Sequence, residues 1–147
     1  MQFVLLFFKT YNKGNMDEVK KTTQVLIVED DRFLRDLLQQ KLTKEGFNTI
    51  AAVDGEEGLR MAKEKTPQLI LLDLILPGVD GFEVLHKMKS DDTLRAIPVI
   101  VLSNLGQKED MERAMSAGAD DFMVKAHFTP TEIVSKVREL IKEKYFR

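Results

Sequence analysis

A short apolar run ending in an acidic pair decides the fold of this chain: Gln24-Val25-Leu26-Ile27-Val28-Glu29-Asp30. A second run of the same kind, at residues 69–72, ends in Asp73. Short apolar runs bounded by polar residues are typical of the buried strands of a parallel sheet. Because open α/β sheets bind ligands at the carboxyl ends of their strands, we expect the three carboxylates to meet in one crevice.

The expected crevice has the composition of a phosphoryl-accepting site. Two later apolar runs also end in polar residues, Ser103 and Lys125. Clustered carboxylates repel one another, so the cluster calls for a divalent cation, and it can present one aspartate as a nucleophile. The sequence therefore predicts carboxylates, a hydroxyl and an ammonium at one edge of a sheet.

Length and composition indicate one ordinary folded domain. The chain has 147 residues, a net charge of −2 and no cysteine. The charge gives no general footprint for nucleic acid, so we expect no direct nucleic-acid partner. The absence of cysteine excludes disulfides and thiolate metal sites, and it fits a cytoplasmic location.

The first 22 residues are expected to form an N-terminal extension to a domain at 23–147. Residues 3–8 are apolar, but a membrane span needs roughly 20 such residues, and the features of a signal peptide are missing. Residues 1–15 are either a disordered or mis-assigned extension, with Met16 as the true start, or a short docking segment. We expect no membrane association.

Strand and helix patterns alternate five times along the rest of the chain. This alternation predicts an α/β fold with a doubly wound parallel sheet covered on both faces. Asp80 is assigned only to a loop, and no second folded domain is expected after the last helix. The expected strands are 24–28, 48–52, 69–73, 98–103 and 121–124, and the expected helices are 32–44, one capped by Asp54, 82–89, 108–117, and one that begins at the capping box of residues 129–132.

Four segments in this order resemble the receiver domain of two-component response regulators, over about residues 23–143. They are residues 25–31, 71–82, 98–103 and 118–125. The resemblance implies a flavodoxin-like (βα)5 three-layer sandwich with strand order 2-1-3-4-5, as in a stand-alone, CheY-like receiver. It also implies a protein that is a phosphoacceptor and not an enzyme.

The resemblance further implies roles for the acidic residues. Asp73 would accept a phosphoryl group from a phosphohistidine on a sensor histidine kinase or a histidine phosphotransfer protein. Mg²⁺ would be held by Glu29, Asp30, Asp73 and the backbone carbonyl of Ile75. Mg²⁺ prefers oxygen ligands and few carboxylates, which suits this set.

The remaining site residues would contact the phosphoryl group and transmit its presence. Lys125 would pair with phosphoryl oxygens, and Ser103 would donate a hydrogen bond to one of them. Phe122 would then turn inward, which would reshape the surface made by residues 108–117, 121–124 and the C-terminal helix. That surface could bind an effector protein or form a homodimer.

Three positions around the expected crevice are unusual for the family. Asn104 stands where a small residue is common, and Ile75 and Leu105 flank the path of the attacking water. Apolar walls cannot orient water, so the sequence predicts slow self-dephosphorylation. Ala126 stands where the family usually has a cis proline, which predicts either a trans bond with a reshaped loop or a strained cis bond.

Phe33 follows the acidic pair and is a candidate contact for the kinase. The competing interpretation is that its ring packs along the edge of the first helix.

Four alternative functions are compatible with parts of the pattern. The domain could be a relay intermediate that passes phosphate to a histidine carrier, or a pseudo-receiver that binds partners without phosphorylation. A phosphatase of the haloacid dehalogenase type would need a second aspartate at position 75, which is isoleucine. A flavodoxin-like electron carrier would not suit the acidic cluster and Lys125.

Overall fold

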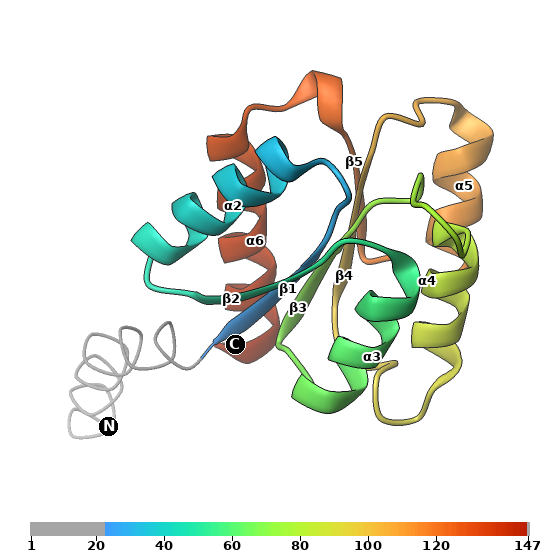
Figure 1. Ribbon diagram of the computed structural model, residues 1–147, viewed down its shortest axis with the longest axis horizontal. Helices are drawn as coiled ribbons and strands as arrows, with labels where there is room; N and C mark the ends of the chain where they lie inside the picture. The colour runs from blue at the N-terminus through green and yellow to red at the C-terminus, as the bar shows by residue number, and fades with distance from the viewer. Residues whose placement is uncertain (1–22, 147) are drawn as a thin grey trace, which may run out of the picture.

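The structure is a computed structural model that describes residues 23–146. One sheet of five parallel strands, in the order β2-β1-β3-β4-β5, has helices on both faces (Figure 1). This arrangement confirms the flavodoxin-like, doubly wound α/β fold. The expectations for residues 1–22 lie outside the described residues. The elements are β1 (Gln24–Val28), α2 (Arg32–Lys44), β2 (Asn48–Ala52), α3 (Gly55–Lys65), β3 (Leu69–Leu72), α4 (Gly81–Ser90), β4 (Val99–Ser103), α5 (Lys108–Ser116), β5 (Asp121–Val124), the 3₁₀ helix η1 (Lys125–His127) and α6 (Pro130–Tyr145).

Side chains that alternate along the strands divide the core into two layers. In β1, Leu26 and Val28 pack with the helices α3, α4 and α5, whereas Val25 and Ile27 pack with α2 and α6 (Figure 1). Every residue of β3 is buried, because both faces of a central parallel strand are covered. Polar side chains are therefore accommodated where the strands end.

Polar side chains cap the N-termini of α2, α3, α4 and α6. The carboxylate of Asp31 accepts a hydrogen bond from the backbone N–H of Leu34, and Thr129 and Glu132 form the expected capping box of α6. Asp80, which the sequence indicates only as a loop residue, caps α4 by accepting a hydrogen bond from the backbone N–H of Phe82 at 2.9 Å. A cap at that point ends the loop between β3 and α4 at a defined residue.

The register of the central strands places two acidic residues side by side. Val28 of β1 lies opposite Leu72 of β3, so the next residues, Glu29 and Asp73, emerge together at the carboxyl end of the sheet. Backbone hydrogen bonds continue this pairing, because the N–H of Asp73 donates to the carbonyl of Val28 at 3.0 Å. A shift of one residue would send one of the two side chains to the other face.

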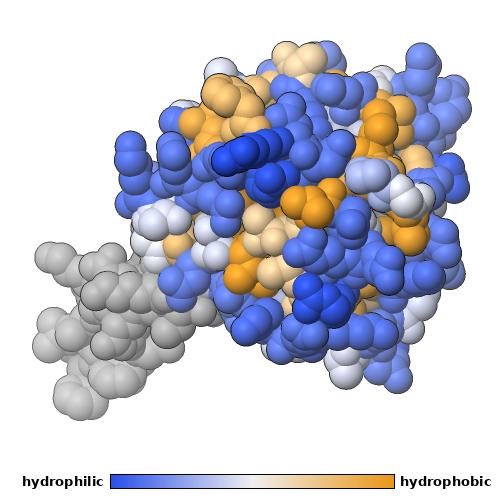
Figure 2. Space-filling model, in the orientation of Figure 1, coloured by the Kyte–Doolittle hydropathy of each residue, from blue (hydrophilic) through white to orange (hydrophobic). Residues whose placement is uncertain are grey.

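The outer surface is mixed in polarity. Hydrophilic side chains dominate the face shown in Figure 2, and apolar ones lie among them in separate groups. No helix within residues 23–146 combines the length and the apolar character that a membrane crossing needs.

Gly81 begins α4 directly against the end of β3. Its N–H donates to the carbonyl of Leu74 at 3.1 Å. A Cβ atom at this position would collide with the backbone of Leu74 and would lie 2.7 Å from the carbonyl oxygen of Asp73. The close approach requires glycine because backbone atoms cannot yield as a flexible side chain can.

We predict that Gly81→Ala lowers the free energy of unfolding by about 2–3 kcal/mol, the upper part of the range for an overpacked site. Chemical denaturation of both proteins measures this difference. Gly106→Ala is the matched control, because a Cβ there would meet only Val124, at 3.8 Å. If the two variants lose equal stability, the close approach is not what position 81 requires.

Candidate functional site

Three acidic residues meet at the carboxyl end of the sheet, as the sequence predicts. Glu29 and Asp73 are buried, with 2% and 4% of their surface exposed, and Asp30 is exposed. One carboxylate oxygen from each residue lies within 4.8 Å of those from the other two. Among residues 23–146 this is the only group of three or more carboxylates or other metal-ligating side chains with such spacing.

Lys125 joins the two buried carboxylates. Its Nζ lies 2.6 Å from Oε1 of Glu29 and 2.7 Å from Oδ2 of Asp73, and only 15% of the side chain is exposed. Burying charged groups is costly unless they are paired and hydrogen-bonded. Here the ammonium of Lys125 contacts both buried carboxylates and so offsets part of that cost. The residue after β5 is thereby connected to the residues after β1 and β3.

Backbone N–H groups hold the other oxygens of these carboxylates. The N–H of Ile75 donates to Oδ1 of Asp73 at 3.1 Å, and the N–H of Asp31 donates to Oε2 of Glu29 at 3.1 Å. Sequence reasoning considered only the carbonyl of Ile75 and missed its N–H. The tendency of aspartate to accept a bond from the residue two positions later was the available signal.

The buried charges shift two pKa values. Burial raises the pKa of Glu29 from 4.5 to about 7, and the neighbouring Asp73 carboxylate adds to the rise, although the bonds from Lys125 and Asp31 oppose it. For Lys125, burial acts to lower the pKa, but hydrogen bonds to Asp73 and Glu29 outweigh it and raise the pKa. The ammonium therefore stays charged, while one of the buried carboxylates is poised to take up a proton near neutral pH.

The donor set fits a hard divalent cation. Three carboxylates and one ammonium leave a net charge of −2 when all are ionised, which one divalent cation neutralises. Carboxylate oxygens with open access to water are typical ligands of Mg²⁺. Exposed Asp30 supplies that access at the mouth of the site.

Ser103 and Phe122 lie on the neighbouring strands β4 and β5. Ser103 is fully buried at the end of β4. It lies opposite Val124, the residue that directly precedes Lys125. Its Oγ accepts a long hydrogen bond, 3.4 Å, from the N–H of Leu105. The ring of Phe122 is buried in the core layer of α3, α4 and α5.

The loops around the site carry the other residues that the sequence singled out. Ile75 is 54% exposed, Asn104 is exposed and Leu105 is half-buried. Phe33 is 79% exposed, so most of its ring is accessible to a partner.

The chain after Lys125 takes one of the two expected forms. Residues 23–146 contain no cis peptide bond. Instead, Lys125–His127 form the short helix η1, and the N–H of Phe128 closes it onto the carbonyl of Lys125 at 3.5 Å. This is a reshaped loop with a trans bond, and it leaves His127 exposed.

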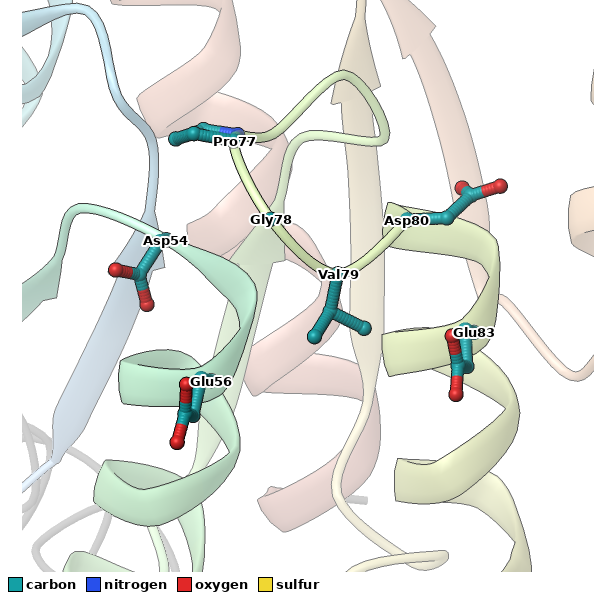
Figure 3. A pocket seen from close by; sticks show the side chains of 7 residues that line it. All are labelled: Asp54, Glu56, Pro77, Gly78, Val79, Asp80 and Glu83. Atoms are coloured by element: carbon teal, nitrogen blue, oxygen red, sulfur yellow. The ribbon is translucent and has the colours of Figure 1, made fainter.

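A second acidic hollow lies beside the loop between β3 and α4. Figure 3 shows Asp54 and Glu56 on one side of this loop, and Asp80 and Glu83 on the other. Asp54 and Asp80 serve as helix caps. Since these carboxylates do not converge, the hollow lacks the spacing of a metal site.

Comparison with known families identifies the chain. The model of the response regulator receiver domain matches residues 25–138. The chain belongs to this family. Receiver domains are the phosphoacceptor domains of two-component systems, are not classical enzymes, and have histidine kinases or phosphotransfer proteins as partners.

Related receiver proteins include transcriptional regulators. Over 119 residues the receiver is 39% identical to the DNA-binding dual master transcriptional regulator RpaA of Synechocystis, covering 81% of this chain and 49% of RpaA. Over the same length it is 34% identical to the phosphate regulon transcriptional regulatory protein PhoB of Escherichia coli, covering 81% of this chain and 52% of PhoB. The chain thus spans about half the length of these relatives.

Solved receiver structures share the fold. A CheY-like receiver domain protein from Methanospirillum hungatei has a TM-score of 0.77 and 28% identity, covering 83% of this chain and 95% of the other. The Mn²⁺-bound form of the response regulator Rcp1 has a TM-score of 0.70 and 27% identity, covering 82% of this chain and 92% of the other.

The raised pKa of Glu29 gives a prediction for stability in buffer with a chelator. Between pH 4.5 and about 7, Glu29 is more protonated in the folded protein than in the unfolded chain. The contribution of this group to the free energy of unfolding is therefore fully present below pH 4.5 and is lost as the pH rises through about 7. Glu29→Gln removes this loss. We expect its stability relative to wild type to increase on the order of 2 kcal/mol from about pH 5 to about pH 8.

Urea denaturation of both proteins at the two pH values measures the change. Glu45→Gln is the control, because Glu45 pairs with Arg138 on the distant α2–α6 surface. A difference between Glu29→Gln and wild type that does not vary with pH would show that Glu29 titrates normally.

Proposed function

We propose that Asp73 accepts a phosphoryl group from a phosphohistidine of a sensor histidine kinase or a histidine phosphotransfer protein. A carboxylate oxygen of Asp73 bonds to phosphorus while the P–N bond to the imidazole breaks. The imidazole keeps the bonding electrons and takes up a proton. Such transfer depends on positioning and charge neutralisation more than on covalent chemistry by the protein.

The contact of Lys125 with both buried carboxylates carries this proposal. The 2.7 Å contact between Nζ and Asp73 places a cation beside the oxygens that would bear the phosphoryl charge. An assembled site also favours phosphorylation over a pseudo-receiver role, because a purely binding module has no need to bury opposed charges.

Magnesium would be held by Glu29, Asp30, Asp73 and the carbonyl of Ile75. The cation, when bound, would neutralise charge on the incoming phosphoryl oxygens. The convergence of the three carboxylates supports this ligand set, as does the similarity to Rcp1, which has been solved in an Mn²⁺-bound form.

We propose that the signalling surface consists of α5, β5 and α6. Ser103 ends the strand that precedes α5, and Phe122 lies within β5, so changes at the site reach this surface through short connections. Nζ of Lys136 in α6 lies 3.4 Å from Oδ2 of Asp121 in β5, and this ion pair connects the two elements. A second copy of the chain or an effector protein would bind there after phosphorylation.

Intact mass tests the phosphoacceptor role. After incubation with Mg²⁺ and acetyl phosphate, the wild type is expected to gain one phosphoryl group and Asp73→Asn none. Asp30→Asn, which keeps the acceptor, should gain it more slowly. Size-exclusion chromatography of the same samples tests for a dimer. A phosphoryl group retained by Asp73→Asn would rule out Asp73 as the acceptor.

We also propose that the phosphorylated domain is long-lived. The exposed Ile75 side chain and the half-buried Leu105 offer no group that orients an attacking water. Asn104, on the same loop as Leu105, would narrow access to the phosphoryl group.

The decay rate of phosphorylated protein tests this second proposal. The double variant Ile75→Asn, Leu105→Glu should lose its phosphoryl group several-fold faster than wild type, because amide and carboxylate groups can orient water. Val53→Asn, at an exposed apolar residue of another loop, should decay like wild type. Decay of the double variant at or below the wild-type rate contradicts the proposal.

We propose that Phe33 contacts the phosphodonor. A large ring that is 79% exposed beside the site is an anchor of the kind that protein interfaces use. Phe33→Ala should slow transfer from a phosphorylated kinase about tenfold, while phosphorylation by acetyl phosphate stays unchanged. Met111→Ala on α5 is the control for loss of an exposed apolar residue. Equal transfer by all three proteins would remove the docking role.

A further inference from the structure

One residue of α2 holds the backbone that carries the acidic pair. The backbone N–H of Arg35 donates to the carbonyl of Asp31 at 2.9 Å. The guanidinium Nη1 of Arg35 donates to the carbonyl of Glu29 at 2.9 Å and to the carbonyl of Asp30 at 3.2 Å. Three consecutive carbonyls, at residues 29, 30 and 31, therefore accept hydrogen bonds from a single residue.

The three acidic side chains differ in how they are held. Glu29 and Asp73 are fixed by Lys125 and by backbone N–H groups. The carboxylate of Asp30 forms no hydrogen bond or ion pair with any residue in the range 23–146. Its position in the cluster thus depends on the backbone that carries it, and Arg35 donates to the carbonyls on both sides of the Asp30 Cα atom.

We propose that Arg35 is a positioning residue for the metal site. Its guanidinium holds the backbone of Asp30 at the edge of the site without contacting the cation. This inference rests on the proposed magnesium ligands. A guanidinium suits the task because it is always charged and its N–H groups are rigidly placed. Hydrogen bonds from a charged donor are stronger than those from a neutral donor. The two bonds from the Arg35 guanidinium, called the Arg35 clamp below, therefore restrict the backbone more than bonds from a peptide N–H would.

The same helix supplies a matched control. Arg32 lies almost one turn before Arg35, its side chain is 87% exposed, and its ion-pair partner is Asp36 at 3.7 Å. Removing Arg32 changes the charge of α2 by the same amount as removing Arg35, but leaves the carbonyls of residues 29 and 30 with their donor. A general effect of charge would therefore appear in both variants, and a positioning effect only in one.

The first experiment measures Mg²⁺ affinity by isothermal titration calorimetry at a temperature where all variants are folded. Arg35→Met should weaken binding about tenfold, the lower end of the usual effect of losing a residue that orients metal ligands. Arg35→Lys, which keeps the charge but not the fixed donor geometry, should lie between Arg35→Met and wild type. Arg32→Met should stay within about twofold of wild type, the effect of a surface charge. Equal affinities of Arg35→Met and Arg32→Met would overturn the proposal.

The second experiment needs no metal or phosphoryl group. In buffer with a chelator, amide hydrogen exchange at Asp31, whose N–H donates to Glu29 Oε2, should be at least several-fold faster in Arg35→Met than in Arg32→Met. Unchanged exchange would show that the guanidinium does not restrain this backbone and would overturn the proposal. If exchange is faster but wild type binds no Mg²⁺, the clamp stands while its role toward a metal, and with it the proposed ligand set, fails.

Phosphorylation separates the two proposals further. At saturating Mg²⁺, Arg35→Met should regain the wild-type rate of labelling by acetyl phosphate, because Asp73 and Lys125 are intact. A rate that stays low at saturating Mg²⁺ would contradict a role limited to Asp30. Failure of wild type itself to take up phosphate would instead refute the proposed function.

Discussion

The site depends on one electrostatic constraint: two carboxylates are buried next to each other at the end of a sheet with one ammonium between them. Glu29 and Asp73 are brought together by strand register, and Lys125 contacts both within 2.7 Å. Removing Lys125 would leave two buried carboxylates without a cation, which is far more costly than losing an exposed pair. The strands β1, β3 and β5 are therefore coupled through the side chains that directly follow them as well as through the sheet.

The same pair of buried carboxylates explains why the site favours the binding of a cation. The two buried carboxylates share a single cation, and the pKa of Glu29 is raised by burial and by Asp73. In the proposed function, a divalent cation would relieve this repulsion, and Lys125 and the cation would together face the negative charge of a phosphoryl group. A site with balanced charges would have little affinity for a divalent cation, so the repulsion between the buried carboxylates favours the proposed metal site.

The rigid and adaptable parts of the domain lie in different places. The core layers and the helix caps fix the sheet, whereas the loops at its carboxyl end carry exposed side chains such as Phe33 and Ile75. Binding and catalytic residues commonly occupy loops on a rigid scaffold. The helix η1 after Lys125 belongs to these loops, and it shows that the family's usual proline is not needed to hold the lysine in contact with the carboxylates.

Sequence alone determined the features that depend on local rules. Alternation of apolar runs and helical segments defined the sheet and its two layers, and Asp54 and Thr129 placed the starts of α3 and α6, because these patterns follow from backbone periodicity and neighbouring hydrogen bonds. The convergence of Glu29, Asp30 and Asp73 also followed, since parallel strands end at a common edge.

Only the tertiary structure decided which partners the side chains take. The contact of Lys125 with both buried carboxylates, the use of the Ile75 N–H, the exposure of Phe33 and the reach of Arg35 across two carbonyls are not encoded by spacing. Each depends on distances between segments that approach one another only in the folded chain. Residue type limits what a side chain can bind, but the packing of distant elements selects the partner that it binds.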